Sequence, residues 1–461
     1  MTHAVVVGAY GSAGVAAAEG LADAPEIDRV TLADDGEPGG LCILRGCMPS
    51  KELLSAAGHR YRARRDPRLG EPPELDVPRT VARKDEHVAS FAAHRREAVE
   101  SLAEREGVEF LPEPVRFVGE DTLRVGEREL EADYVVVATG STLAVPDLDG
   151  LERVDPWTSA DVLDATELPA SGVVMGFGYV GLELVPYLAE AGVDLTVIEH
   201  DERPMDRAPD AVGETVLDLY REEFGVDVLT NARERRVERT ENGVAMEVQC
   251  PGERRTVEAE SLFMFTGRHP NLRGVALDAC GVETEGKWVA DTLRTRGNEH
   301  VFVAGDANGE RTLLHHAKEE GYLAAENVAA AERGEELEAY DPITHQVTFT
   351  AAAEFPYASV GMTEREADAA GYDAFSVERA ASDDGVFAVR DAEVGMAQLV
   401  VAESGTVLGY HGLHKDADTM AKTIQVIVEN GMSIAEIPDR AYHPTTPEII
   451  DGLVGDAAER L

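Results

Sequence analysis

Lysine and cysteine are scarce in this chain of 461 residues, and the charge is strongly one-sided. The sequence holds six lysines and four cysteines, and 42 basic residues face 88 acidic ones, so the net charge is 42 − 88 = −46. A nucleic-acid partner is excluded, because neutralising phosphates requires a basic surface. So large a charge repels itself at low ionic strength but is screened in molar salt. We therefore expect a halophilic source with a salt-filled cytoplasm; the alternative is an ordinary acidic mesophilic protein.

Long apolar runs are also missing. No stretch of about 18 apolar residues occurs, so the sequence predicts no membrane-spanning helix. The N-terminal segment MTHAVVVGAY lacks the basic residues that precede the apolar part of a signal peptide. We therefore expect a cytoplasmic protein. Cysteine thiols are normally kept reduced there, so a close cysteine pair is more often catalytic or metal-binding than structural.

Two segments share one plan, which is a buried strand, a glycine-rich turn, an Ala/Leu-rich helix and a second strand that ends in acids. They are AVVVGAYGSAGVAAAEGLADAPEIDRVTLADD, residues 4–35, and GVVMGFGYVGLELVPYLAEAGVDLTVIEHDE, residues 172–202. This βαβ plan is typical of dinucleotide binding, so its presence twice predicts two Rossmann-like domains.

The second unit matches the G-x-G-x-x-G pattern directly. Gly176, Gly178 and Gly181 allow a tight turn, close approach of a pyrophosphate and close helix–strand packing. The anion then lies at the helix N-terminus. Glu199 ends the second strand, where an acid hydrogen-bonds a ribose hydroxyl.

The first unit departs from this pattern. If Gly11 and Gly14 are its second and third glycines, Ala9 occupies the place of the first, and Gly8 precedes it. Asp34 supplies the acid at the end of the second strand.

The texture of the sequence changes near residue 346. Short alternating runs, GMAQLVVA (395–402) and TVLGYHGLH (406–414), predict antiparallel strands, and a helix follows over 419–429. The predicted fold class is therefore α/β, with two Rossmann-like dinucleotide-binding domains and a third, C-terminal α+β domain.

Half of the cysteines lie in GGLCILRGCMPSK, residues 39–51, and this segment resembles the redox-active disulfide segment of the flavin-dependent pyridine nucleotide-disulfide oxidoreductases. The motifs ATGS, GFGYVGLE, TGRHPN, AGDA and HPTTPE follow in the family's order, so the resemblance covers essentially the whole chain. It implies an NAD(P)H-dependent disulfide oxidoreductase (EC 1.8.1 type) that acts as a homodimer. The implied domains are an FAD-binding domain over 1–148 and 272–337, an NAD(P)-binding domain over 149–271 and a dimerisation domain over 338–461.

The resemblance implies that Cys42 and Cys47 alternate between a disulfide and a dithiol. Cys47 is then the flavin-facing sulfur and Cys42 the interchange sulfur that attacks the substrate. Pro49 and the Ala/Leu-rich run after it predict a helix that starts near Cys47, and the positive end of that helix stabilises a thiolate. A metal site is not expected, because C-x4-C is poor zinc spacing and no second ligand pair follows.

Two further pairs carry catalytic roles by resemblance. Lys51 resembles the lysine near the flavin N5 atom, paired with Glu183, where a cation stabilises the anionic reduced flavin. His443 and Glu448 resemble the family's acid/base pair, in which a carboxylate orients an imidazole that protonates the departing thiolate. In this family the histidine reaches in from the partner subunit.

The resemblance also implies the cofactors, which are FAD and either NADPH or NADH. Asp34 resembles the ribose ligand of FAD, Val115 a backbone contact with its adenosine half, Gly140 part of its wall and Asp306 the acid near its ribityl and phosphate groups. Tyr179 resembles the ring that moves aside for nicotinamide. The complete set of implied cofactor-binding residues is Gly8, Gly11, Gly14, Asp34, Gly40, Lys51, Val115, Gly140, Asp306, Gly176, Gly178, Tyr179, Gly181, Glu199, Gly267 and Arg268.

The choice between the two nicotinamide cofactors stays open at this level. Glu199 argues for NADH, since a carboxylate repels a 2′-phosphate. Reductases of low-molecular-weight thiols lean as a class to NADPH, and His200, Arg203 and Arg207 are near enough in sequence to serve a phosphate.

Several branches of the family compete. Mercuric reductases carry a C-terminal cysteine pair that this sequence does not show. LLHHAKEEG (313–321) resembles the LAHKAEEEG motif of dihydrolipoamide dehydrogenases, but the first histidine of their usual HAHPTLSE motif is missing here. Glutathione-reductase-like enzymes match LGYHGLHKDADTM (408–420) better, and the bis-γ-glutamylcystine reductases of halophilic archaea combine that match with an acidic composition. A flavin-bound redox sensor without turnover is the non-enzymatic alternative.

The predicted substrate is therefore a small-molecule disulfide, with bis-γ-glutamylcystine as the first candidate. Its carboxylates call for cations near the site. Arg62 and Arg65 fall on one helical stripe with Lys51, and they either contact the substrate or stabilise the helix end and pair with surface acids.

Overall fold

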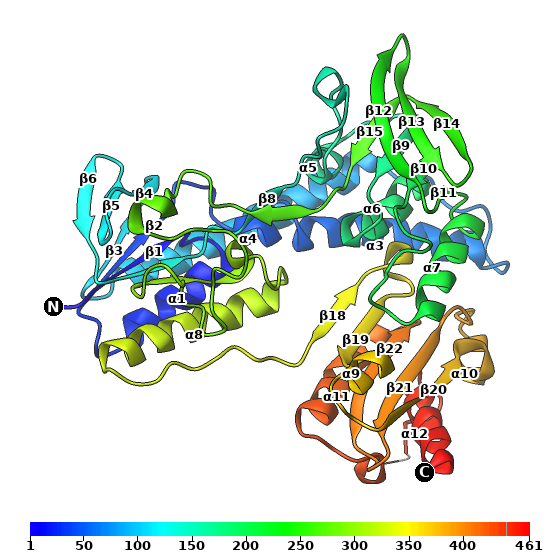
Figure 1. The fold of residues 1–461 in the computed structure, drawn as a ribbon. Helices are drawn as coiled ribbons and strands as arrows, with labels where there is room; N and C mark the ends of the chain where they lie inside the picture. Colours follow the sequence, from blue (N-terminus) through cyan, green and yellow to red (C-terminus); the bar gives the residue numbers. More distant parts are fainter. Residues whose placement is uncertain (439) are drawn as a thin grey trace. The chain divides into compact units, whose positions relative to one another are not determined.

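The structure is a computed structural model that describes residues 1–438 and 440–461 (Figure 1). Contacts divide the chain into two compact units, which are described separately. Unit 1 comprises Met1–Pro49, Ala82–Val145 and Arg268–Pro342, and unit 2 comprises Ser50–Val81, Pro146–Gly267 and Ile343–Leu461. Two helices run across these limits, α3 (Cys47–Arg65) and α4 (Val77–Ala103).

Unit 1 is built on a five-stranded parallel sheet in the order β17-β7-β1-β2-β3. Its strands are rich in valine, and every residue of the two central strands β1 and β7 is buried, as expected for a parallel sheet covered on both faces. The strands are β1 (His3–Val7), β2 (Arg29–Ala33), β3 (Val108–Leu111), β7 (Tyr134–Val137) and β17 (Val301–Val303).

Two helices of unit 1, α1 (Ser12–Asp23) and α8 (Leu314–Glu332), lie side by side in Figure 1. Their close approach depends on Gly321, because a Cβ atom there would lie 2.3 Å from the carbonyl oxygen of Ala13. The other elements of unit 1 are the short helix α2 (Gly40–Leu44), the antiparallel sheet of β4 (Val115–Phe117), β5 (Thr122–Val125) and β6 (Arg128–Glu131), the pair β8 (Ser141–Leu143) and β16 (Arg268–Pro270), and the turn η3 (Gly305–Asn308).

Unit 2 contains a second parallel sheet, in the order β11-β10-β9-β15. The second predicted βαβ segment forms β9, α6 and β10 of this sheet. Its elements are β9 (Ser171–Met175), α6 (Tyr179–Glu190), β10 (Asp194–Ile198), α7 (Asp210–Glu222), β11 (Asp227–Leu229) and β15 (Ser261–Met264), with α5 (Ser159–Asp164) before them. An antiparallel sheet of β12 (Arg233–Thr240), β13 (Gly243–Cys250) and β14 (Glu253–Ala259) is inserted before β15.

The C-terminal part of unit 2 is a five-stranded antiparallel sheet in the order β18-β19-β22-β21-β20, which confirms the predicted α+β region. The alternating runs over 395–402 and 406–414 form β21 (Met396–Ala402) and β22 (Val407–Leu413), but both strands are buried on both faces. The other strands are β18 (His345–Thr348), β19 (Tyr357–Gly361) and β20 (Ala374–Ala380), and the helices are α9 (Glu364–Ala369), α10 (Gly385–Ala388), α11 (Ala417–Glu429) and α12 (Glu448–Arg460). Among the described residues, no helix combines the length and apolar character that crossing a bilayer requires.

Candidate active site

The cysteine pair lies in unit 1 at the junction of two helices. Cys42 is in α2 and Cys47 is the first residue of α3. Neither cysteine is in a disulfide; Cys42 is half-buried and Cys47 is exposed. Gly46 lets the turn between them close, because a Cβ atom there would lie 2.9 Å from the carbonyl oxygen of Leu41. A hydrogen bond with Cys47, and burial, raise the pKa of the Cys42 thiol.

Cys42 opens onto a cavity of about 520 Å³ within unit 1, whereas Cys47 is not on its wall. A volume between about 300 and 1,000 Å³ is usual for a site that binds a small molecule. The wall is formed by residues of α1, α4, α8 and the cysteine segment, which are Ser12, Val15, Ala16, Glu19, Cys42, Ile43, Met48, Phe91, His94, Arg95, Ala98, Leu314 and Lys318. Of the two sulfurs, Cys42 is therefore the one that a molecule in the cavity reaches.

The glycine turn after β1 corrects the alignment that placed Ala9 as the first glycine. Gly8 has φ +92°, close to the φ of +94° at Gly176 in the second unit. A Cβ atom on Gly8 would lie 2.5 Å from the carbonyl oxygen of Ala138, and one on Gly14 would lie 2.0 Å from that of Gly8. Gly8 is therefore the first glycine, and the turn contains one extra residue before Gly11.

Gly11 is not required by the protein's own packing. Its φ is −68°, and the nearest atoms to a Cβ there lie at 3.5 Å, which is ordinary contact. The glycine therefore leaves room for a group bound at the start of α1, as FAD requires. Asp34 accepts hydrogen bonds from the backbone N–H groups of Tyr10 and Gly36, both at 2.8 Å. Burial raises the pKa of its carboxyl group, and these two bonds oppose the rise.

A polar chain connects two of the other predicted FAD residues. The Ser141 hydroxyl donates to Asp306 at 2.7 Å, and Arg268 Nε donates to the same hydroxyl at 2.9 Å. Burial lowers the pKa of the Arg268 guanidinium, and the charge of Asp306 opposes this. Next to this chain, the Thr139 hydroxyl is buried without a hydrogen-bond partner among the described residues. Such an orphan hydroxyl fits a site that a polar cofactor completes.

The loop that carries Asp306 is held by a buried acid that the sequence analysis did not single out. Glu320 accepts hydrogen bonds from the Gly305 N–H and the Asn308 side-chain amide, both at 2.7 Å. Burial raises the pKa of Glu320 to about 7. The motif LLHHAKEEG, which contains Glu320, does not indicate this role, because the hydrogen-bond partners of Glu320 come from the preceding turn.

The turn predicted to bind the nicotinamide nucleotide lies in unit 2, and its three glycines are of two kinds. A Cβ atom on Gly176 would lie 2.5 Å from the Phe265 carbonyl oxygen, and one on Gly181 would lie 2.5 Å from that of Gly176. Gly178, at the N-terminus of α6, has φ −75° and no atom within 4 Å of a Cβ position. The fold therefore requires Gly176 and Gly181, whereas Gly178 leaves space for a bound pyrophosphate.

This contrast gives a prediction. Gly178→Ala should leave unfolding unchanged but weaken NAD(P)H binding about tenfold or more, because the methyl group occupies the space of the pyrophosphate. Gly176→Ala should instead lower stability, since its φ of +94° and its short approach to Phe265 both penalise a side chain. Calorimetric titration with each nucleotide, together with urea unfolding in molar KCl, separates the two effects. Normal nucleotide affinity in Gly178→Ala contradicts the assignment.

The acid at the end of β10 and two of the three cations near it, His200 and Arg203, already have polar partners. Glu199 is buried and accepts a hydrogen bond from the Asp201 N–H at 2.8 Å, and burial raises the pKa of its carboxyl group. His200 contacts Glu234 at 2.6 Å, and Arg203 pairs with Asp210. Tyr179 begins α6, is half exposed, and donates its hydroxyl to Gln346 at 2.7 Å.

Lys51 and Glu183 form a close ion pair in unit 2. Lys51 Nζ lies 2.7 Å from both carboxylate oxygens of Glu183, and it lies 4.4 Å from the centre of the Phe349 ring. The side chains are 31% and 16% exposed, so water screens the pair only in part. Phe349 was not anticipated from the sequence, because it follows β18, far along the chain from Lys51.

His443 and Glu448 also lie together. His443 Nδ1 is 3.0 Å and 3.1 Å from the two carboxylate oxygens of Glu448, and Glu448 also accepts a hydrogen bond from the Thr445 N–H at 3.0 Å. These contacts, that with His443 first, lower the pKa of the Glu448 carboxyl group. The imidazole is 79% exposed, so its other nitrogen is open to a second molecule.

The remaining predicted residues lie on turns and a short strand. Gly40, Gly140 and Gly267 all have positive φ, at +63°, +69° and +87°, so each holds a backbone conformation that favours glycine. Val115 lies on β4 and pairs with Val125, and its contact with FAD stays a prediction.

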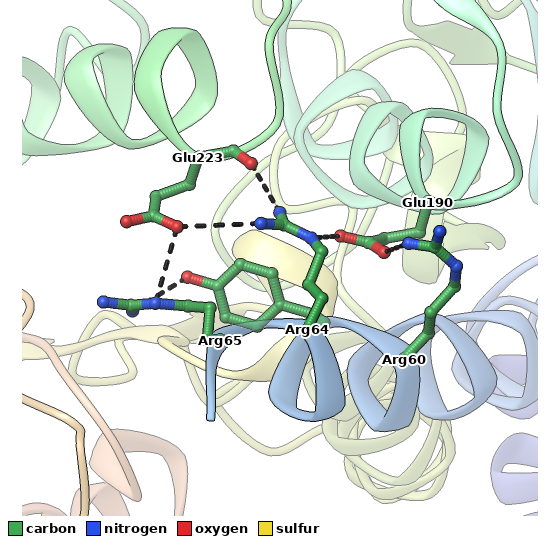
Figure 2. A network of polar contacts seen from close by, with 6 residues as sticks. Arg60, Arg64, Arg65, Glu190 and Glu223 are labelled. Atoms are coloured by element: carbon green, nitrogen blue, oxygen red, sulfur yellow. Dashed lines mark hydrogen bonds and ion pairs between the residues drawn. The ribbon is translucent and has the colours of Figure 1, made fainter. Parts of the chain in front are cut away.

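The arginines near the end of α3 pair with acids of unit 2. Arg62 Nε lies 3.4 Å from Glu354, and Arg65 Nε lies 3.5 Å from Glu223 and is drawn with it in Figure 2. Arg65 also donates to the Tyr61 hydroxyl at 3.1 Å. Of the two interpretations open from the sequence, these contacts favour acid pairing over substrate contact.

Comparison with protein families identifies the chain. Residues 2–321 match the pyridine nucleotide-disulphide oxidoreductase model, and residues 346–453 match the dimerisation domain of the same family. The chain belongs to the pyridine nucleotide-disulphide oxidoreductase family. Membership implies FAD and a pyridine nucleotide as cofactors, and the dimerisation domain indicates a homodimer.

Its relatives act on different substrates. It is 29% identical over 447 residues to a mercuric reductase of Bacillus cereus, covering 94% of this chain and 68% of that protein. It is 30% identical over 439 residues to dihydrolipoyl dehydrogenase 2 of Haloarcula marismortui, covering 91% and 89%. The fold also matches the HOCl-induced flavoprotein disulfide reductase RclA of Escherichia coli, with a TM-score of 0.83, 22% identity and coverage of 98% and 99%. The family is therefore fixed, and the substrate has to be argued from the site.

Proposed function

We propose that this enzyme uses NAD(P)H to reduce a low-molecular-weight disulfide, with bis-γ-glutamylcystine as the substrate. One observation carries the proposal, which is that Cys42 is hydrogen-bonded to Cys47 and lines a cavity of about 520 Å³. A cavity of this size suits a small disulfide. The net reaction is NAD(P)H + H⁺ + RSSR → NAD(P)⁺ + 2 RSH.

The residues around the cofactor sites fit the groups that the family uses. Gly11 and Gly178 leave space at two helix N-termini, and Thr139 offers an unpaired hydroxyl. FAD bound there would supply two-electron transfer from NAD(P)H to the Cys42–Cys47 disulfide. Lys51, paired with Glu183, is proposed to hold a positive charge beside the flavin.

The reduced cysteine pair then exchanges with the substrate. Cys47, the first residue of α3, is the proposed thiolate. The raised pKa of Cys42 keeps that sulfur a thiol, so a base must take its proton before attack. Cys42 attacks one substrate sulfur, an S–S bond forms between them, and the other half leaves as a thiolate. Cys47 next attacks the Cys42 sulfur, releases the second thiolate and restores the Cys42–Cys47 disulfide. Both thiolates end as thiols, one with the proton taken from Cys42 and the other with a proton from solvent.

His443 is the proposed proton carrier. Its Nδ1 faces Glu448, and the exposed ring leaves Nε2 able to take the Cys42 proton and pass it to the leaving thiolate. We propose that it acts on the site of a second copy of the chain, as the family resemblance implies. Tyr442, next to it, is 88% exposed, which is consistent with a surface that a partner covers.

A second candidate is dihydrolipoamide dehydrogenase, which the 30% identity to the Haloarcula marismortui enzyme favours.

The test is steady-state oxidation of NADPH and of NADH in molar KCl, with bis-γ-glutamylcystine, lipoamide and mercuric ion as rival acceptors. We expect turnover of bis-γ-glutamylcystine. Turnover of lipoamide alone contradicts the proposal and assigns the enzyme to dihydrolipoamide, and turnover of mercuric ion alone assigns it to metal reduction.

A further inference from the structure

One cation on the wall of the Cys42 cavity, Arg95, forms no ion pair with a described acid, although Glu19 of the same wall is near enough to attract it electrostatically. Arg95, on α4, is half-buried, and its one hydrogen bond runs from Nη1 to the Gly11 carbonyl oxygen at 3.4 Å. No carboxylate of the described chain lies within salt-bridge distance of its guanidinium. A half-buried arginine without an ion pair is unexpected in a protein with a net charge of −46. The half-buried Arg60 and Arg64, by contrast, both pair with Glu190.

A second cation lies on the same wall. Lys318, one of only six lysines, has its Nζ 5.8 Å from the centre of the Tyr322 ring, with no carboxylate partner in the described part of the chain. The single acid of the wall, Glu19, instead accepts a hydrogen bond from the Tyr322 hydroxyl. The charged groups of the wall that remain for a ligand are therefore mainly cationic, and apolar side chains such as Phe91 line the rest of the cavity.

We propose that Arg95 binds a carboxylate of the substrate disulfide, so that the enzyme selects anionic low-molecular-weight disulfides over neutral ones. This inference rests on the proposed function, because the ligand of the cavity is taken to be the disulfide that Cys42 attacks. A guanidinium presents a planar set of donors that fits a carboxylate, and a half-buried, unpaired one has donors to spare. Lys318 adds a second positive charge to the same wall. Arg95 thus takes the role that the sequence left open for Arg62 and Arg65.

The test compares two disulfides of nearly the same size, dithiodiglycolate and its diamide, in molar KCl. The wild-type holoenzyme should prefer the diacid. Arg95→Gln should lower kcat/KM for the diacid about ten- to a hundredfold, as expected for a lost hydrogen bond to a charged group, and change the diamide about threefold or less. Arg95→Lys should keep part of the preference, since lysine keeps the positive charge but lacks the planar set of donors that binds a carboxylate with two hydrogen bonds. Bis-γ-glutamylcystine should follow the diacid.

Arg96→Gln is the matched control, because it removes the same charge from the next, exposed residue of α4, which is not on the cavity wall. It should leave the preference unchanged. Flavin content and unfolding midpoint should be equal in all variants. If the wild type reduces neither compound, nor bis-γ-glutamylcystine, the proposed function fails and this inference with it. If the wild type is active but Arg95→Gln keeps the full preference, or loses both activities equally, the inference alone is overturned.

Discussion

Cys42→Ser and Cys47→Ser should each lower disulfide turnover by roughly a thousandfold or more, because each removes one of the two sulfurs that must act in sequence. The two variants should differ in what they trap. Cys47→Ser retains the sulfur that lines the cavity, so it should form a mixed disulfide with the substrate that nothing resolves. Cys42→Ser retains only the sulfur off the cavity wall and should form none.

Intact-mass measurement after incubation with bis-γ-glutamylcystine checks this directly. Cys47→Ser should gain one half of the substrate per chain, located by digestion at Cys42, in the flavin-loaded holoenzyme. In Cys42→Ser the bound flavin should cover Cys47, which is otherwise exposed. Cys280 serves as an internal control, since burial raises its pKa to about 11 and makes it a poor nucleophile. An adduct on Cys47 in the Cys42→Ser variant, with none on Cys42 in its counterpart, would falsify the proposed order of attack.

The elements that could be predicted from the sequence are those whose signals are local. A valine-rich strand followed by glycines that need positive φ specifies the turns after β1 and β9 within a few residues, and both turns were found. The detailed alignment at Ala9 was wrong because spacing alone does not tell which glycine must hold a left-handed conformation. Gly8 does so, and the turn accommodates an additional residue.

Other elements had no such signal. The strand β12 is almost entirely charged or polar, and only Val237 is buried among its eight residues, so no apolar alternation marks it. Arg95 and Cys42 line one cavity although 53 positions separate them, because α4 packs there only in the folded chain. The catalytic segments were visible as motifs, whereas the groups that surround them depend on tertiary packing.

A buried ion network between α3, α6 and the end of α7, shown in Figure 2, also depends on tertiary packing. Arg64 Nε donates to Glu190 at 2.7 Å, and Arg60 pairs with the other carboxylate oxygen. Arg64 also donates to the Glu223 carbonyl oxygen. The Glu190 side chain is 2% exposed, whereas each of the two arginines that pair with it is 27% exposed. This places a fully desolvated carboxylate between two cations.

The network joins α3 and α6 at a second point, beyond the Lys51–Glu183 pair. Glu183 and Glu190 are seven residues apart on α6, which is about two helical turns, so they lie on one face. The two ion pairs therefore fix α3 along its length, including the stretch that carries Lys51.

Glu190→Gln should destabilise unit 2 by about 3 kcal/mol, because breaking a buried ion pair leaves charge that burial has stripped of water. Asp155→Asn is the matched control in the same unit. Its partner Arg239 lies at 2.6 Å, but Asp155 is 95% exposed, so the loss should stay below about 1 kcal/mol.

The two tryptophans allow each unit to be followed alone in urea unfolding, since Trp157 lies in unit 2 and Trp288 in unit 1. In a Trp288→Phe background, Glu190→Gln should shift the Trp157 transition to lower urea. In a Trp157→Phe background, the Trp288 transition should move less. Molar KCl should shrink the effect at Asp155 more than that at Glu190, since salt screens exposed charges first. If both substitutions shift the unfolding midpoint equally, the ion pairs of Glu190 contribute no more than an exposed pair, and the prediction is wrong.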